Sequence, residues 1–394
     1  MNKKEVFCWG MYDLANTIFS ALFVTFFFPF YVKTFLGGNE FQIGLMFGLS
    51  MLAVGFAVPV IGAWSDEVGK RMPFIIVFTI ICCIFTWLTA GVTLMWALIA
   101  GFLANFSYHA ALTTYNALLP RLGNNDEIGN ISGIGTAMGY LGTLISLAIA
   151  APILAYLGWE TQEGARAIFA ATAVMFFVFS LPTFFGIKEK RAKMNTSIVR
   201  SIKNVGKTVR NAWKHKHFVY LMGSMFCFTD AINAVIIFLF LFAKDRIHLG
   251  VKAFFFVYAV QSLGATAGSF IAGRAGDRFG QKKVLTVAGV TWIAVIVLLM
   301  FVQNYTIFLV AGVLGGAALG AVWTAQRPKM LELVADKDVG QFFGFLELTN
   351  KFSGVFGPII FGALAHAVSY FAALASLVVF FVAGLFLLRK VPGD

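Results

Sequence analysis

Charged side chains are scarce in this sequence. Only 12% of its 394 residues are Asp, Glu, Lys or Arg, whereas 59% are apolar. A soluble domain of this length needs far more polar surface, so the composition excludes a soluble globular protein. The mean hydropathy of +0.84 indicates instead that most of the chain lies in a lipid bilayer.

Sequence patterns of catalysis and cofactor binding are also missing. There is no P-loop for ATP hydrolysis, no H-E-x-x-H zinc motif and no G-x-S-x-G nucleophile elbow. The cysteines have neither metal-site nor disulfide spacing, and they fall inside or beside apolar runs, as buried thiols do. We therefore expect no enzymatic activity, no cofactor and no metal. The four cysteines are Cys8, Cys82, Cys83 and Cys227.

Long apolar runs dominate the chain. They are continuous rather than alternating with period two, which excludes a transmembrane β-barrel and predicts an all-α membrane protein. At about 20 apolar residues per crossing, six runs precede a polar segment and six follow it. The first run is longer than the apolar region of a signal peptide and has no small-residue cleavage site after it, so we expect it to persist as a helix. The predicted spans lie near 7–32, 41–64, 73–92, 94–119, 130–157, 164–186, 218–243, 251–273, 283–302, 306–330, 341–366 and 368–388.

The distribution of lysine and arginine predicts the orientation. An even number of spans puts both termini on one side, and nearly all basic residues fall on that side, so both termini are predicted to be cytoplasmic, in a bacterial inner membrane. Segment 188–217 is strongly basic, with apolar residues at helical spacing. This pattern predicts a cytoplasmic linker whose amphipathic helix binds anionic lipids, and it gives no reason to expect nucleic acid. The basic residues elsewhere are Lys33, Arg166, Lys244, Arg246 and Lys252 on the far side, and Lys351 inside a span.

An internal repeat divides the chain. The loop after the second span contains GAWSDEVGKRMP and the loop after the eighth contains GRAGDRFGQKKV, and corresponding residues are 211 positions apart, as Gly62 and Gly273 are. The offset predicts two copies of a six-helix unit, residues 1–187 and 218–394, joined by the linker 188–217. Parallel repeats of this kind place a transport site between the halves, near the middle of the membrane.

The repeated loop is predicted to gate the cytoplasmic side. Its first glycine would allow close packing at a helix end, its aspartate would accept hydrogen bonds from a neighbouring helix N-terminus, and its basic residue would face cytoplasm and headgroups. Arg327, near the cytoplasmic end of the tenth span, is expected to contact Glu332 or a helix end there. The gate residues are Gly62, Asp66, Gly69, Arg71, Gly273, Asp277, Gly280, Lys282 and Arg327.

These loops, of the form G-x-x-x-D-x-x-G-x-[RK], resemble the signature of the major facilitator superfamily, and the resemblance covers essentially the whole chain. Four further segments are similar to the family of vacuolar amino-acid effluxers linked to yeast autophagy and to its bacterial relatives. The resemblance implies twelve helices in two six-helix bundles, a gating role for the loop aspartates, and export of amino acids. The four segments are WGMYDLAN, YNALLPRL, GNISGIGTAMGYLG and GQFFGFLELTNKFSGVFGP.

Ionisable residues inside spans are the candidates for transport chemistry, because each costs about 2.5–3.5 kcal/mol to insert. Asp13 with Asn16 and Asp230 with Asn233 form a D-x-x-N pattern in the first and seventh spans, although their offset is 217 rather than 211. Each aspartate is interpreted as a proton carrier, a ligand for a cationic amine, or a structural partner of a neighbouring donor. For Asp13, closer to the cytoplasm, the structural role gains weight.

The eleventh and fourth spans add further polar groups. Glu347 and Lys351 are four residues apart with the acid first, the favourable order for an intrahelical pair, and Lys351 would bind a carboxylate if that pair opened. His109 is either an interhelical donor or a proton relay. The remaining candidates are Asn350 in the eleventh span and Asn105 and Tyr108 in the fourth.

Acids on some helices and a lysine on another suit a zwitterion. We therefore predict a monomeric secondary transporter that works by rocker-switch alternating access, couples to protons and exports a small polar or zwitterionic solute, such as an amino acid. The charges alone would also admit amines or small peptides. A lipid transporter and a non-transporting membrane sensor on the same fold remain as alternatives.

Overall fold

The structure, a computed structural model, describes residues 3–90, 93–123, 125–189, 215–333, 346 and 348–393, with the backbone alone at residues 63, 66, 120, 125–130 and 132. The predicted amphipathic helix of the linker lies outside these residues, as does Glu347. Throughout the described part, every regular element is a helix.

Ten of these helices are long and apolar enough to cross a membrane. Another, α4, is apolar and 17 residues long, and the eleventh span of the chain is described only in its later part, which includes α14. The predicted all-α membrane fold of twelve spans is therefore confirmed. The elements are α1 (Lys3–Phe19), η1 (Ser20–Phe27), α2 (Phe28–Phe35), α3 (Glu40–Val68), α4 (Met72–Leu88), α5 (Leu94–Asn116), η2 (Leu119–Arg121), α6 (Asn125–Leu157), α7 (Gln162–Gly186), α9 (Lys216–Ile247), α10 (Val251–Phe279), α11 (Gln281–Met300), α12 (Tyr305–Leu331), α14 (Phe356–Ala367) and α15 (Tyr370–Arg389).

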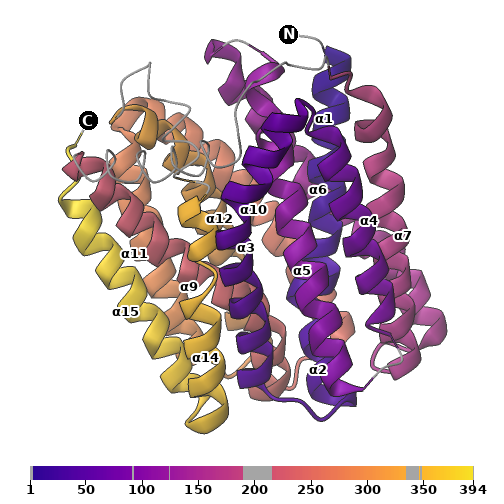
Figure 1. The fold of residues 1–394 in the computed structure, drawn as a ribbon. Helices are drawn as coiled ribbons and strands as arrows, with labels where there is room; N and C mark the ends of the chain where they lie inside the picture. The colour runs from indigo at the N-terminus through magenta and orange to yellow at the C-terminus, as the bar shows by residue number, and fades with distance from the viewer. Residues whose placement is uncertain are drawn as a thin grey trace. The chain divides into compact units, whose positions relative to one another are not determined.

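The described helices form two compact units. Unit 1 contains residues up to 38 and from 49 to 189, and unit 2 contains residues 39–48 and those from 215 onward. In unit 1, α1 packs against α6 and α7, and α4 packs against α5 and α7. In unit 2, α12 packs against α10 and α11, and α15, yellow in Figure 1, runs beside α9 and α11.

The first nine residues of α3, 40–48, belong with unit 2, a division that the repeat did not predict. Gly44 lies against the backbone of Pro358 and Gly48 against that of Val355, so close that a Cβ on either glycine would collide with the chain. Glycine permits this approach because it has no side chain to separate the two backbones.

The first span is one continuous helix from Lys3 to Phe35 with a π-helical middle, η1. Inside η1 the Thr25 hydroxyl donates to the Ser20 carbonyl, five residues back, at 3.1 Å. Such π-helical segments are uncommon and often mark functional regions. This span and α9 are 78% buried within the protein, against 33–50% for the other long spans. They are the spans best shielded from lipid.

Glycines of α6 bring it into contact with α1. A Cβ on Gly135 would meet the Asp13 carboxylate and the Trp9 ring, and one on Gly142 would lie 3.0 Å from the carbonyl carbon of Leu14. Small residues on one helix face allow such close packing in membranes. The segments WGMYDLAN and GNISGIGTAMGYLG are therefore the two sides of one helix contact.

The eleventh span is broken, although a single helix was predicted there. Residues 348–352 are helical, residues 353–355 form a turn, and α14 begins at Phe356. The turn contains Ser353 and Gly354, both poor helix formers. The second half of this span therefore begins with its own helix N-terminus inside the membrane domain.

Candidate functional site

Asp13 and Asn16, the polar pair of the first span, bind each other. Asn16 is 5% exposed, and its Nδ2 donates to Asp13 Oδ1 at 3.1 Å. The Thr17 hydroxyl donates to the Asp13 carbonyl at 2.8 Å. With Gly135 of α6 against the Asp13 carboxylate, this polar face of α1 is turned into unit 1.

Asp230 lies in the middle of α9 and is 0% exposed. Its Oδ2 accepts a hydrogen bond from the backbone N–H of Gly357, the second residue of α14, at 2.8 Å. Its Oδ1 has no hydrogen-bond partner among the described residues. A buried carboxylate oxygen without a partner is uncommon, so this atom is a candidate position for a further ligand.

The D-x-x-N pattern occurs in the first and seventh spans, but its contacts in the two spans are only partly alike. Asp230 makes no hydrogen bond to Asn233, which is half-buried one turn further along α9, because its carboxylate turns to α14 instead. Both aspartates nevertheless lie against glycines of the fifth helix of their own unit: Gly135 approaches Asp13, and Gly357 approaches Asp230. The two units therefore use an aspartate and a glycine at similar places.

Lys351 and Asn350 lie on the short helical stretch before the turn 353–355. Lys351 is 5% exposed and Asn350 is half-buried. Because Glu347 lies outside the described residues, the predicted pair with Lys351 stays a prediction.

The polar groups of the fourth span, α5, are divided between packing and hydrogen bonding. Asn105 is 1% exposed, and its Nδ2 donates to the Ser50 hydroxyl at 3.0 Å, which ties α5 to α3. Tyr108 packs against Phe19 of the first span, with ring centroids 4.8 Å apart. His109 lies edge-on to Tyr108 at 4.7 Å.

An aromatic cluster not predicted from the sequence joins α1 to α5. Trp9 and Tyr115 stack at 4.7 Å, and the Tyr115 hydroxyl donates to the Trp9 carbonyl at 3.0 Å. The Tyr12 hydroxyl lies 2.7 Å from that of Thr79 on α4. Tyr12 and Tyr115 stand within WGMYDLAN and YNALLPRL, so these two segments are also in contact.

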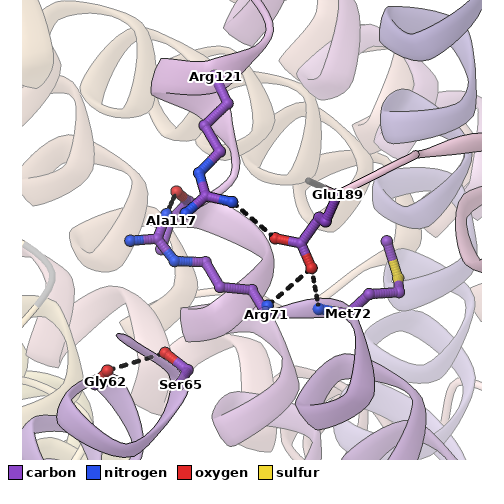
Figure 2. Close-up of polar contacts among 7 residues, drawn as sticks. All are labelled: Gly62, Ser65, Arg71, Met72, Ala117, Arg121 and Glu189. Carbon is purple, nitrogen blue, oxygen red and sulfur yellow. Dashed lines mark hydrogen bonds and ion pairs between the residues drawn. The ribbon is translucent and has the colours of Figure 1, made fainter. Parts of the chain in front are cut away.

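A network of ionic and backbone contacts holds the start of α4 (Figure 2). Glu189 accepts hydrogen bonds from the backbone N–H groups of Arg71 and Met72, each at 2.7 Å. It also pairs with Arg121 at 2.9 Å. The Arg71 guanidinium donates to the carbonyl of Ala117, just after α5 ends. An anion at a helix N-terminus and a cation at a helix C-terminus both favour the macrodipole.

The second copy of the loop shares part of this design. Gly69 and Gly280 both have left-handed backbone conformations, with φ of 71° and 96°, which glycine adopts without strain. Lys282, the counterpart of Arg71, donates to carbonyls at the end of α15, those of Arg389 and Val391. In both units, the basic residue of the loop binds a helix C-terminus.

Three gate residues lack their predicted contacts among the described residues. A Cβ at Gly62 would meet no described atom within 4 Å, and one at Gly273 would meet only a described methyl group at 3.9 Å. Asp277 is exposed and accepts no hydrogen bond from the described residues. The acid that binds a helix N-terminus is Glu189, and the sequence signal that could have indicated it is its isolation in a basic segment.

Two gate residues have a different status. Only the backbone of Asp66 is described, so its predicted role stays a prediction. Near half-buried Arg327, Glu332 forms an ion pair with Lys329 at 2.6 Å, a partner that the sequence did not indicate.

A second polar cluster lies at the opposite ends of these spans, within unit 2. The Tyr370 hydroxyl is 2.9 Å from Glu40 Oε1 and 2.8 Å from Asp245 Oδ2. Beside it, Asp245, Arg246 and Tyr370 line a cavity of about 330 Å³ together with apolar side chains. Residues 330 positions apart in the chain form this contact, so spacing in the sequence contains no sign of it.

Replacing Tyr370 by phenylalanine is expected to destabilise unit 2, because the hydroxyl that donates to the carboxylates of buried Glu40 and exposed Asp245 is lost. The loss should be about 1.5–3 kcal/mol, the usual contribution of a hydrogen bond to a charged group. Thermal unfolding of the purified protein in detergent measures it. Tyr156→Phe is the matched control, since Tyr156 is 89% exposed, and equal stability of the two variants would contradict the assignment.

Comparisons with known proteins agree with this architecture. Residues 41–393 match the model of the family described as vacuole effluxer Atg22 like. The MFS-type transporter YxiO of Bacillus subtilis, described as uncharacterised, is 22% identical over 99% of this chain and 95% of its own. A homologue of the multidrug resistance efflux pump PmrA from Lactococcus lactis is 23% identical over 90% and 87%.

Two solved structures share the fold. The nucleoside transporter NupG has a TM-score of 0.79 at 15% identity, covering 99% of this chain and 100% of that one. A bacterial homologue of the human lysosomal transporter Spinster has a TM-score of 0.72 at 16% identity, covering 99% and 98%. The family model covers residues 41–393, which is nearly the whole chain. The protein therefore belongs to the vacuole effluxer Atg22-like family of the major facilitator superfamily of secondary transporters.

Proposed function

We propose that this protein is a proton-coupled secondary transporter that exports a zwitterionic solute of amino-acid type. The observation that carries the proposal is Asp230, a carboxylate that is 0% exposed and has one oxygen without a hydrogen-bond partner among the described residues. Ionisable side chains in membrane spans are normally paired, and buried polar atoms are rarely left without a hydrogen bond. An unfilled oxygen therefore favours a proton or ligand site over a purely structural one.

The solute class follows from the charges around the seventh and eleventh spans. Asp230 offers a site for an ammonium group, and Lys351, buried at 5% exposure, offers one for a carboxylate. Asp230 lies on α9, which packs against α14, and Lys351 lies five residues before α14 begins. A molecule with one positive and one negative end fits both, whereas a simple amine would use only the acid.

The direction and the setting are part of the same proposal. The name of the PmrA homologue, an efflux pump, supports export. Bundles 1–187 and 218–394 would alternate access around a central site. We expect a monomer in a bacterial inner membrane with both termini cytoplasmic and the linker 188–217 on anionic lipids.

Flux in proteoliposomes tests this function. Vesicles with an internal pH dye and an imposed gradient of labelled mixed amino acids should show amino-acid flux with proton movement for the wild type. Asp230→Asn should abolish the proton movement. Glu163→Gln, which removes an exposed carboxylate at the start of α7, should leave it intact.

Two results would contradict the proposal. If the wild type moves neither protons nor labelled amino acids, lipids, small peptides and a sensor role become the candidates. If Glu163→Gln loses proton movement as completely as Asp230→Asn, the effect is not specific to the buried carboxylate.

A further inference from the structure

The two oxygens of Asp230 have different surroundings. Oδ2 is fixed by the backbone N–H of Gly357, at 2.8 Å, at the first turn of α14. The contact is rigid, because a Cβ on Gly357 would lie 2.9 Å from the carbonyl carbon of Asp230, so the two backbones touch. Oδ1 has no partner among the described residues. The carboxylate is therefore fixed through Oδ2, and Oδ1 is the oxygen at which another ligand can bind.

The helix N-terminus explains why the carboxylate stays in place. The first N–H groups of a helix have no partners within the helix and attract an anion. The break at 353–355 creates such an end inside the membrane domain, and α14 continues from it for 12 residues. Because broken membrane helices often form transport sites in this way, Asp230 is positioned by the break in the eleventh span.

Other titratable groups around Asp230 are few. Cys227 lies one turn earlier on α9 itself. Among the elements packed against α9, α15 has none between Tyr370 and Arg389, and α14 has only His366, near its far end. On α12, Tyr305 stands at the start, and Arg327 and Lys329 stand near the end, where Lys329 pairs with Glu332.

Lys351 is the charged residue that most closely precedes α14 in the sequence. It lies five residues before the helix begins. It could hold the carboxylate end of a zwitterion without occupying Oδ1, which as an acceptor binds a proton or a donor such as an ammonium group. No described carboxylate other than Asp230 stands on α9 between Lys216 and Lys244.

We infer that Oδ1 of Asp230 is an exchange position that binds either a proton or the ammonium group of the solute, but not both. This inference rests on the proposed function and specifies its coupling. Since the two ligands compete for one oxygen, the protein is an antiporter in which proton entry drives solute exit. Recognition of the solute requires its ammonium group. Asp230 is closed to solvent in this structure, so exchange occurs in conformations that open it.

The sign of the pH change inside vesicles tests antiport with the wild-type protein. Proteoliposomes are loaded with labelled neutral L-amino acids and an internal pH dye, then diluted into buffer without amino acids. Antiport should acidify the interior as amino acids leave, whereas cotransport would make it alkaline. N-acetylated amino acids, which lack the ammonium, should produce neither efflux nor acidification.

Competition has a second signature in binding. As the pH falls below the range in which Asp230 titrates, the apparent affinity for amino acids should weaken about tenfold per pH unit, because the deprotonated fraction falls by that factor. Asp230→Asn should lose amino-acid binding at every pH while remaining folded, since its amide oxygen can still accept from Gly357. Glu163→Gln, at an exposed position at the start of α7, should keep the wild-type pH dependence.

The outcomes separate the inference from the function on which it rests. Alkalinisation of the interior, or exchange of N-acetylated amino acids as fast as free ones, would overturn the exchange position while leaving amino-acid transport standing. Flux of labelled amino acids with no proton movement would overturn it too. Absence of any amino-acid flux would overturn the proposed function itself.

Discussion

Replacing Gly142 by alanine is expected to separate α6 from α1 and to lower the free energy of unfolding by about 1–3 kcal/mol, the usual cost of overpacking. The new methyl group would lie 3.0 Å from the carbonyl carbon and the Cα of Leu14 and closer still to its carbonyl oxygen. Those atoms belong to the backbone of a buried helix, so no change of rotamer can move them away from the new methyl group. The helices themselves must move apart.

Gly133→Ala is the matched control on the same helix. Gly133 is exposed, and a Cβ there would meet no atom of the described residues within 4 Å. Alanine favours a helix over glycine by up to about 1 kcal/mol, so this variant should be as stable as the wild type or more so. Thermal unfolding in detergent, followed by size-exclusion recovery, compares the two.

The contrast also concerns function, because the α1 contact positions Asp13. Gly142→Ala should reduce transport even at temperatures where the protein stays folded, whereas Gly133→Ala should not. Equal melting temperatures for the two variants would show that α6 does not pack on α1 through Gly142.

Hydropathy was sufficient to predict the membrane fold, since each crossing requires its own apolar run. The π-helical segment Ser20–Phe27 could not be predicted in this way. Apolar length says how far a helix extends but nothing of which carbonyl each N–H binds. The break at 353–355 was missed for the same reason, although Ser353 and Gly354 weakened the helix there.

The candidate site was predictable in its residue types and not in its contacts. Asp13 and Asp230 were singled out because charge is costly in a bilayer, yet their partners differ: Asn16 is three residues away, whereas Gly357 is 127 residues away. Local spacing predicts the first kind of contact only. Gly62 shows the converse, since a repeated glycine predicted a packing role for which the described residues supply no partner.

Replacing Glu189 by alanine is the second large effect that we expect. Its carboxylate accepts from two backbone N–H groups at the start of α4, and its side chain is only 4% exposed. Losing hydrogen bonds to a charged group costs about 1.5–3 kcal/mol. The start of α4 should loosen, and with it the loop that contains Arg71.

Glu189→Gln and Arg121→Ala separate the parts of this network. Glutamine keeps an acceptor for the N–H groups of Arg71 and Met72 but loses the charge that favours a helix N-terminus, so it should be destabilised less than alanine. Arg121 has a side chain that is 37% exposed, and removing one partner of so exposed a pair should cost about 1 kcal/mol or less.

The order of stability in thermal unfolding is therefore predicted to be wild type, Arg121→Ala, Glu189→Gln and Glu189→Ala, from most to least stable. If Arg121→Ala proves as damaging as Glu189→Ala, the ion pair rather than the binding of the α4 N-terminus holds the loop. If Glu189→Gln matches the wild type, the charge contributes nothing, and hydrogen bonding alone accounts for the position of Glu189. Because Lys282 occupies the corresponding place in unit 2 without an acid beside it among the described contacts, the first result would also make the two loops unlike in how they are stabilised.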